Sequence, residues 1–473
     1  MISLLAFYTL AFRTIKPRDV VNPSRDADDY RSLPNIIWSC LTTILLCTWV
    51  SLHPNVPKPV DETKLNKRQW CAHKLRAFIK DQAFPFVLLL VAPEWILMWA
   101  LRQRFVVEYM VRTKKVPSRR HGFFIIMGGF HKFNRVKTLK LTLSDPPISD
   151  PAPSDPLIWS DIEKKHTDKA IEEEYGEPRH PLDRFDVCRL VDDGRLRLPP
   201  EVEIDDKSKS DWIAKALVLL QTLWFVVQCI ARRIDHLPLT ELEVVTLGYA
   251  LLNLVIYVIW WDKPQKVARP IRIFCGELLK RNDKQSRIQR RMKRASWFQK
   301  LYHILVGAQD DQVDLRSVEK APVFYSGNPP QDWPFKLLNL EDFAMVVTAM
   351  IGSVFGAIHL LAWSSPFPTR KMLISWRWGS TLMAVAPLPI LTWFIAYLFL
   401  ASLQGVENIF LRVIHNRIIF PLAVLSAILS LSLVPLVYVA GRVITLILAF
   451  QTLSTLPSEA FQSVQWTNLL PHV

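Results

Sequence analysis

The stretch LLLVAPEWILMWALRQR, Leu88–Arg104, is apolar enough to enter a membrane, yet it carries a carboxylate near its middle. Glu94 directly follows Pro93, and the nearest basic residue along the chain is Arg102. An ionised carboxylate near the bilayer interior costs a few kcal/mol even on lenient insertion scales. We therefore expect Glu94 to be protonated, paired or in contact with water, and to face other helices rather than lipid.

The rest of the chain indicates a membrane protein with many spans. Half of its 473 residues are apolar, although it also holds 58 Lys and Arg and 43 Asp and Glu, so the apolar residues must gather in blocks. Runs of about 20 apolar residues can cross a bilayer core as helices, whereas barrel strands are about half as long. Seven such runs are present: Asn35–Leu52, Ala83–Leu101, Ile213–Ala231, Leu242–Trp261, Phe343–Trp363, Gly379–Ala401 and Ile418–Ala440.

The last run continues past Arg442, so an interfacial helix or an eighth span follows. The predicted fold class is an all-α membrane protein: a helical bundle of seven or eight transmembrane helices with a membrane-apposed domain built from two long loops. In chain order we expect an apolar or amphipathic N-terminal segment (1–34), two spans (35–101), a loop that is basic and then acidic (102–212) and two further spans (213–261). A basic loop (262–342), three spans (343–440) and an interfacial or eighth helix with a tail (441–473) follow.

Charge indicates which side the long loops face. The stretch Arg102–Lys140 holds eleven Lys or Arg against the single acid Glu108, and positive charge near helix ends marks the cytoplasmic side. The chain also lacks an N-x-S/T sequon in which x is not Pro, which suits loops that avoid a glycosylating lumen. The long loops are therefore predicted to be cytosolic. The equally basic loop His53–Gln82 argues against this side, because seven consecutive spans place it on the opposite face.

The basic run Arg287–Leu305 spaces apolar residues among cations, as an amphipathic helix on anionic lipid does. Nucleic-acid binding is the rival interpretation of such a run, but its place beside a membrane span favours lipid headgroups as the partner. The residues predicted to bind lipid are Arg290, Arg291, Lys293 and Arg294.

Motifs of soluble catalysis are absent from the sequence. It holds no P-loop, dinucleotide-binding, HExxH or GxSxG pattern, and its six cysteines show no CxxC spacing. We expect no cofactor and no metal site. Functional residues are sought instead among the polar groups within the spans.

These intramembrane polar residues lie at helical spacing. Asn253 and Tyr257 share one face of the fourth span, Gln221 and Gln228 share a face of the third, and His359 continues the Gly352–Gly356 stripe of the fifth. A GxxxG stripe in a membrane helix is most often a packing surface, and a lone histidine or glutamine most often satisfies a neighbouring helix. The predicted polar site comprises Glu94, His359, Gln221, Gln228, Asn253 and Tyr257, with His359, Gln221, Asn253 or Arg442 as the partner of Glu94.

Several stretches together resemble a group of fungal multi-pass integral membrane proteins. The shared words include LPNIIWSCLTTILLCTWVSLHPNVP (33–57), LVAPEWILMWALRQ (90–103), HGFFIIMGGF (121–130), LPLTELEVVTLGYALLNLVIYVIWWDKPQ (237–265), GAIHLLAWSSPFPT (356–369) and WTNLLPHV (466–473). The resemblance spans nearly the whole chain. It implies a fungal source and a shared membrane fold, and it carries no activity, substrate or catalytic residue.

The resemblance also draws attention to residues at the membrane interface. HPNVP closes the first span with His53 and Asn55 beside two prolines, a rigid exit that is expected to present an imidazole at the interface. HGFFIIMGGF, which begins at His121, is too short to span and too apolar for a solvated loop. We expect it to pack the loop domain onto the membrane, with a dip into the bilayer as the alternative.

Three function classes fit these observations. The leading one is a transport or channel-like protein with a polar cavity around Glu94, bound to a small molecule or ion. The second is a membrane-embedded enzyme in fungal specialised metabolism, in which a protonated Glu94 is a general acid acting on a hydrophobic small molecule. The third is a membrane scaffold or receptor, in which Glu94 only pairs for structure.

Overall fold

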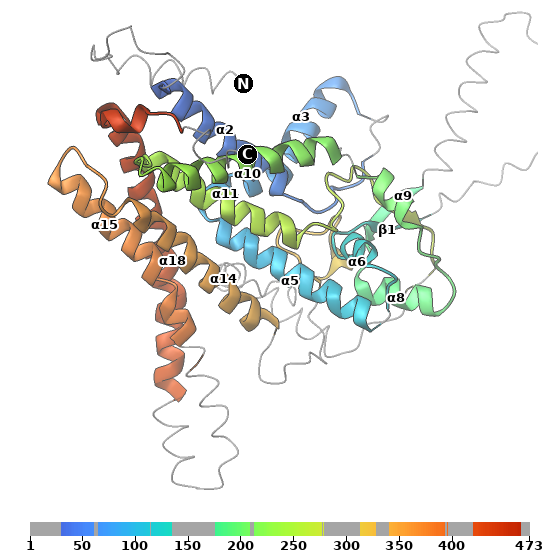
Figure 1. Ribbon diagram of the computed structural model, residues 1–473. Coiled ribbons are helices and arrows are strands. Elements are labelled where there is room, and N and C mark those ends of the chain that lie inside the picture. The colour runs from blue at the N-terminus through green and yellow to red at the C-terminus, as the bar shows by residue number, and fades with distance from the viewer. Residues whose placement is uncertain are drawn as a thin grey trace, which may run out of the picture.

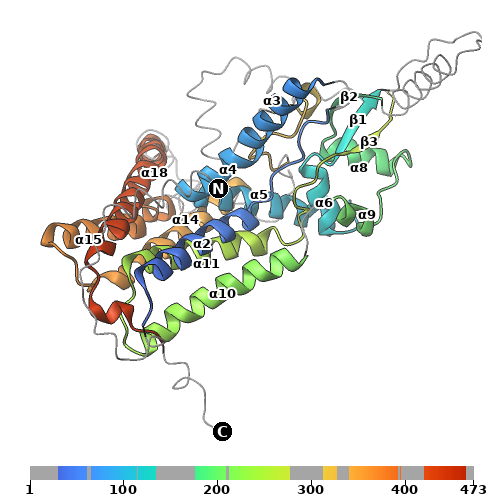
Figure 2. The same cartoon turned by 90° about the horizontal axis from the view of Figure 1, so that it is seen from above.

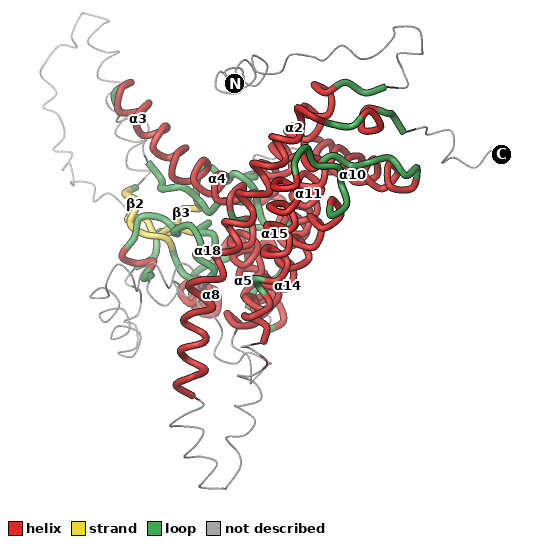
Figure 3. The backbone as a smooth tube through the Cα atoms, turned by 90° about the vertical axis from the view of Figure 1, so that its left-hand side faces the viewer, coloured by secondary structure: helices red, strands yellow, loops and turns green. Residues whose placement is uncertain are grey.

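The computed structural model describes residues 30–60, 65–113, 115–134, 176–208, 212–276, 278, 313–327, 340–392, 395 and 420–464 (Figure 1). This part of the chain is mostly helical, as the red segments of Figure 3 show. Its elements are α2 (Leu33–Ser51), α3 (Lys67–Phe78), the π-helical turn η3 (Ile79–Ala83), α4 (Phe84–Val91), α5 (Pro93–Arg112), α6 (Arg119–Ile126), β1 (Phe130–Asn134), β2 (Glu177–Pro181), α8 (Arg184–Asp192), α9 (Glu201–Asp206), α10 (Trp212–Ile234), α11 (Glu241–Ile259), β3 (Ile271–Ile273), η5 (Leu315–Ser317), α14 (Leu340–Ile358), η6 (His359–Ala362), α15 (Arg370–Val385), α18 (Phe420–Gln451), η8 (Thr452–Thr455) and η9 (Ser458–Phe461).

Five of the described helical segments are long and apolar enough to cross a membrane. They are Leu33–Ser51, Lys215–Ile234, Glu241–Ile259, Phe343–Ala362 and Leu433–Thr455, and each overlaps a run that the sequence predicts as a span. The predicted span Gly379–Ala401 is described only in part: α15 begins nine residues before it, at Arg370, and most of the residues after Thr392 lie outside the described part. The protein is therefore a helical protein with several membrane-spanning candidates.

The predicted straight span Ala83–Leu101 is instead two helices. The helical segments Lys67–Val91 and Pro93–Arg112 meet at Ala92 with a bend of 114°. Ala92 has φ −146° and ψ 69°, outside the helical region, and Pro93 begins α5. Proline disfavours helical geometry in the residue before it and lacks an N–H, yet it suits the first position of a helix. Pro93 thus ends one helix and starts the next.

Contacts at the ends of the helices correct the predicted sidedness of the first loop. The N–H of Val56, just after α2, donates to the carbonyl of Met127 (2.9 Å), and the Asn55 amide donates to the Pro322 carbonyl (2.8 Å). Lys320 forms an ion pair with Asp81. Since a hydrogen bond cannot reach across a bilayer, the first loop lies at the same end of the bundle as segments of both long loops, not at the opposite end.

A small sheet, absent from the all-α prediction, joins the two long loops. Its strand order is β2-β1-β3, with β1 antiparallel to β2 and parallel to β3. Figure 2 shows the sheet at one end of the molecule with α6, α8 and α9, away from α15. The stretch HGFFIIMGGF forms α6 and the start of β1, linked by Gly128 at φ +83°, a conformation that glycine adopts without steric cost. Its apolar side chains are buried in the core that α5 shares.

Glycines allow α15 to approach two helices closely. A Cβ added to Gly356 would lie 2.3 Å from the backbone nitrogen of Ala384, and one added to Gly441 would lie 2.8 Å from the Gly379 carbonyl oxygen. The predicted packing role of the GxxxG stripe therefore matches the position of Gly356. The helix α18 is continuous through Gly441 and Arg442, so the residues after Ala440 extend the same helix instead of starting an interfacial one.

Candidate functional site

Glu94 lies in the first turn of α5 and is held by two residues of α18. The Arg442 Nη1 donates to both carboxyl oxygens of Glu94 at 3.1 Å, and the Tyr438 hydroxyl donates to Oε1 at 2.6 Å. The side chain of Arg442 is 5 % exposed and that of Glu94 is 13 % exposed. Of the partners weighed from the sequence, the structure selects Arg442. Charge-assisted hydrogen bonds of this kind are about twice as strong as neutral ones.

Arg442 is enclosed by aromatic rings. Its guanidinium carbon lies 4.3 Å from the centre of the Phe355 ring and 4.6 Å from that of Tyr249, distances at which a cation is attracted to a π face. Its Nε donates to the Tyr249 hydroxyl at 3.2 Å, and that hydroxyl donates to the carbonyl of Leu90 at the end of α4. Within the described part of the chain, Nη2 has no hydrogen-bond partner. The pair thus joins α4, α5, α11, α14 and α18.

The Glu94 side chain forms part of the wall of a cavity of about 120 Å³, which lies between α5, α14, α18 and the residues after α15. Most of its lining is apolar, and the oxygen-bearing side chains among it are Glu94, Thr348 and Tyr438. The other lining residues are Ala92, Trp95, Met98, Met345, Ala349, Gly352, Pro387, Ile390, Val434, Pro435 and Val439. Glu94 is therefore the one carboxyl group among the described residues on this wall.

His359 lies one aromatic ring away from the ion pair. Its ring centre is 4.9 Å from that of Phe355, whose other contacts include Arg442. The His359 Nδ1–H donates to the Phe355 carbonyl at 2.9 Å, and the Trp376 indole donates to the His359 carbonyl at 3.1 Å. His359 therefore satisfies its own helix and α15, and it does not line the cavity.

The remaining residues of the predicted polar site lie elsewhere. Asn253 joins α11 to α2, since it accepts from Ser51 at 2.7 Å. The Tyr257 ring is centred 6.1 Å from that of His53. Gln221 and Gln228 are half-buried on α10, which packs against α2 and α11. Of the six predicted residues, Glu94 alone borders the cavity, because each polar face points at a different neighbouring helix.

A second buried polar cluster forms where α11 ends, around Lys263. The Lys263 ammonium donates to the backbone carbonyl of His53, to Gln103 Oε1 (2.9 Å) and to Asn55 Oδ1 (3.4 Å). It lies 4.4 Å from the centre of the Trp260 ring and 4.6 Å from that of the Trp99 ring. His53 and Asn55, expected at an exposed interface, are both buried here, because Lys263 and the indoles close over them.

Burial shifts two titratable groups in this Lys263 cluster. It lowers the pKa of Lys263 well below its ordinary value, because the three acceptors are uncharged and do not compensate the ammonium for lost water. Burial likewise lowers the pKa of His53 to about 3. The His53 Nδ1–H donates to the Ser51 carbonyl at 2.9 Å. The cluster fastens the segment after α2 to α5 and α11.

The other predicted interface and lipid-binding residues have separate positions. His121 is buried, with its Nδ1 2.8 Å from the Ser118 hydroxyl and its Nε2 2.8 Å from the Pro199 carbonyl, so it ties α6 to the segment before α9. The predicted lipid-binding residues lie outside the described part of the chain: Arg290, Arg291, Lys293 and Arg294.

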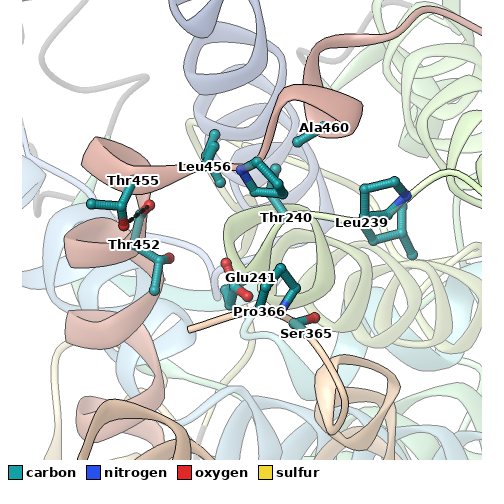
Figure 4. Close-up of a pocket in the computed structure, with 11 residues that line it drawn as sticks. Leu239, Thr240, Glu241, Ser365, Pro366, Thr452, Thr455, Leu456 and Ala460 are labelled. Atoms are coloured by element: carbon teal, nitrogen blue, oxygen red, sulfur yellow. Dashed lines mark hydrogen bonds between the residues drawn. The ribbon is translucent and has the colours of Figure 1, made fainter. Parts of the chain in front are cut away.

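A small pocket at the opposite end of α11 holds a second buried carboxyl. Figure 4 shows Glu241 near Ser365 and Thr452 in a pocket of about 10 Å³. That volume suffices for about one water molecule. Of these two pockets, the cavity at Glu94 is the one with room for a larger ligand.

Sequence reasoning missed three residues that complete these clusters. Tyr438 precedes Arg442 by four residues and therefore lies on the same face of the helix. This spacing predicts that a partner of Arg442 also lies near Tyr438. Lys263 lies two residues after the tryptophan pair 260–261, and a cation close to aromatic residues at the end of a span indicates an aromatic enclosure. Gln103 gave no comparable signal, because its partners come from distant segments.

Comparison with known proteins adds one finding. Residues 184–282, which include α8 to β3, match a family of unknown function, DUF8562. No curated protein and no solved structure matches the chain.

Proposed function

We propose that the protein is an integral membrane protein of the transport class, carrier or channel-like, whose working site is the cavity at Glu94. One observation carries this proposal: a carboxylate at a helix break inside the bundle lines a cavity instead of being fully enclosed. Ionisable residues within membrane bundles commonly mark substrate or ion pathways. Broken helices whose ends face a central site are a recurring feature of transporters.

The proposal includes a topology in which α4 and α5 form a re-entrant hairpin. Arg442 links Glu94, at the start of α5, to Tyr249 near the middle of α11. Gln103, further along α5, accepts a hydrogen bond from Trp260, which lies at the end of α11. Thus α5 runs from mid-depth back to the end at which the first loop lies. Non-helical backbone at depth is tolerated when it is buried in protein or borders a cavity, as Ala92 does.

This topology leaves six crossing segments: α2, α10, α11, α14, the segment that begins with α15, and α18. An even number places both ends of the described bundle on one side, in agreement with the hydrogen bond from the Arg31 N–H to the Phe461 carbonyl (2.7 Å). It also gathers the basic loop 53–82 and the basic membrane-proximal parts of the two long loops on a single face. By the positive-inside rule we assign this face to the cytosol, where the long loops form one domain around the sheet.

The geometry favours transport over the two rival classes. Both oxygens of Glu94 accept hydrogen bonds from Arg442, so in this arrangement the carboxyl has no proton facing a substrate for general-acid catalysis. A purely structural pair does not require a cavity beside it. We also propose that the chain belongs to the fungal multi-pass group that its sequence resembles, on the strength of the shared sequence words.

The test is flux through proteoliposomes that contain the full-length protein. Proton, cation and small-solute fluxes are measured for the wild type, for Glu94→Gln and for Glu108→Gln, which removes a carboxylate from α5 outside the cavity. We expect at least one flux above that of empty liposomes, reduced about tenfold or more by Glu94→Gln and unchanged by Glu108→Gln. Absence of flux for every solute refutes transport, and equal flux in Glu94→Gln refutes the site. A new metabolite in expressing cells that Glu94→Gln abolishes favours the enzyme.

A further inference from the structure

The oxygen-bearing side chains on the cavity wall share one chemical property: none has a proton left to donate into the cavity. The Tyr438 hydroxyl donates its hydrogen bond to Glu94 at 2.6 Å, and the Thr348 hydroxyl donates its hydrogen bond to the Ala344 carbonyl at 2.7 Å. Glu94 accepts from Arg442 at both oxygens. A hydroxyl and a carboxylate oxygen keep further lone pairs after such bonds. The wall therefore offers hydrogen-bond acceptors to a bound molecule.

The charge of the wall disfavours ions. Glu94 and Arg442 neutralise each other at 3.1 Å, so their combined field on a ligand is weak. An ion entering this largely apolar cavity loses its hydration without gaining an unpaired opposite charge. An uncharged hydrogen-bond donor incurs a far smaller desolvation cost, and it finds three candidate acceptors.

The volume sets the size of the molecule. An engineered apolar cavity of about 150 Å³ binds benzene, so the 120 Å³ at Glu94 suits a body of about one ring or a short branched chain. Trp95, Met98 and Met345 on the wall supply polarizable contacts for such a body.

We propose that the cavity at Glu94 binds a small uncharged molecule with an apolar body and one hydroxyl donor, an alcohol or a phenol, whose hydroxyl donates to Glu94, Tyr438 or Thr348. This inference rests on the proposed function for its membrane setting and names the class of substrate. Whether the ligand enters from the lipid phase or from water, the same hydrogen-bond acceptors and apolar wall recognise it.

The test compares two probes of nearly equal size, 4-fluorophenol and 1,4-difluorobenzene, binding to the full-length protein in nanodiscs. Fluorine NMR line broadening gives the affinity of each, after subtraction of the signal from empty nanodiscs. A hydrogen bond to a charged acceptor makes the phenol bind about tenfold more tightly or better. Ala349→Leu, which fills the cavity, abolishes binding of both probes. Thr348→Val, nearly isosteric, removes one acceptor and reduces the preference for the phenol.

Equal affinity for the two probes overturns the inference, as does binding that Ala349→Leu leaves unchanged or the absence of binding by either probe. A melting curve of each variant verifies its fold before the comparison. The outcome is separable from that of the flux test. Phenol-selective binding without any flux refutes transport alone, and Glu94-dependent flux without phenol selectivity refutes the ligand class alone.

Discussion

Removing either member of the Glu94–Arg442 pair is expected to destabilise the protein, and the two substitutions are expected to be unequal. Taking one partner from a buried ion pair costs about 3–5 kcal/mol, because the remaining charge stays buried without compensation. In Glu94→Gln the uncompensated group is Arg442, 5 % exposed and enclosed by rings. In Arg442→Gln it is Glu94, which keeps the Tyr438 donor and borders the cavity. We therefore expect Glu94→Gln to cost about 4 kcal/mol and Arg442→Gln about 3 kcal/mol.

The double variant Glu94→Gln/Arg442→Gln leaves no buried charge at this position, so it should be more stable than Glu94→Gln alone. Contacting residues of this kind typically couple by up to about 3 kcal/mol. The assay is reversible unfolding of the purified protein in mixed micelles with increasing dodecyl sulfate, followed by tryptophan fluorescence, with Glu108→Gln as the matched carboxylate control. The reasoning is refuted if the single effects add to within about 0.5 kcal/mol, the range found for independent sites.

Four further predictions concern other parts of the molecule. Gly356→Leu should abolish the folded state in size-exclusion chromatography, because its Cβ would meet the Ala384 nitrogen at 2.3 Å, whereas Gly276→Ala should be neutral since the nearest atom lies 3.8 Å away. Tyr249→Phe leaves the Leu90 carbonyl without its donor and should cost about 1–3 kcal/mol in the same unfolding assay; a cost below that range contradicts the role given to Tyr249. His53 has a pKa lowered to about 3 in the folded protein against 6.5 in the unfolded chain, so stability should fall as the pH drops below 6.5, by about 2 kcal/mol at pH 5; melting curves of His53→Asn, which keeps a donor for the Ser51 carbonyl, should lose that component. Replacing four basic residues by Gln should weaken binding of the full-length protein in nanodiscs to anionic vesicles, and unchanged binding removes the lipid assignment of Arg290, Arg291, Lys293 and Arg294.

The sequence predicted the inward position of Glu94 because the cost of a lipid-facing carboxylate does not depend on any other segment. It also named Arg442 among the partners, since an arginine within an apolar run faces the same constraint. It did not separate the four partners, because hydropathy and periodicity fix which face of a helix is polar and leave open which helix packs there. Asn253 shows this limit. The sequence predicted that its side chain faces another helix, and in the structure that helix is α2, through the hydrogen bond from Ser51, and not α5.

The helix break at Ala92 was missed for a different reason. A window of hydropathy registers Phe84–Leu101 as one run, and a single proline in such a run is compatible with a kinked span as well as with a full reversal. The proposed reversal rests on contacts between distant segments, among them the hydrogen bond from the Val56 N–H to the Met127 carbonyl, which no hydropathy window contains. The small sheet was missed because its strands have 3 to 5 residues and pair only through distant segments.

The contacts of the break tie its stability to the proposed site. In an uninterrupted helix the Leu90 carbonyl would accept from the N–H of Glu94, and the bend removes that donor. The Tyr249 hydroxyl takes its place, and the same hydroxyl accepts from Arg442 Nε at 3.2 Å. Arg442 in turn neutralises the carboxylate that begins α5. A ligand that draws Glu94 away from Arg442 would therefore loosen the bond that keeps the Leu90 carbonyl satisfied. We propose that occupation of the cavity and the angle between α4 and α5 are coupled through Glu94, Arg442 and Tyr249, which would link binding to movement in a transport cycle.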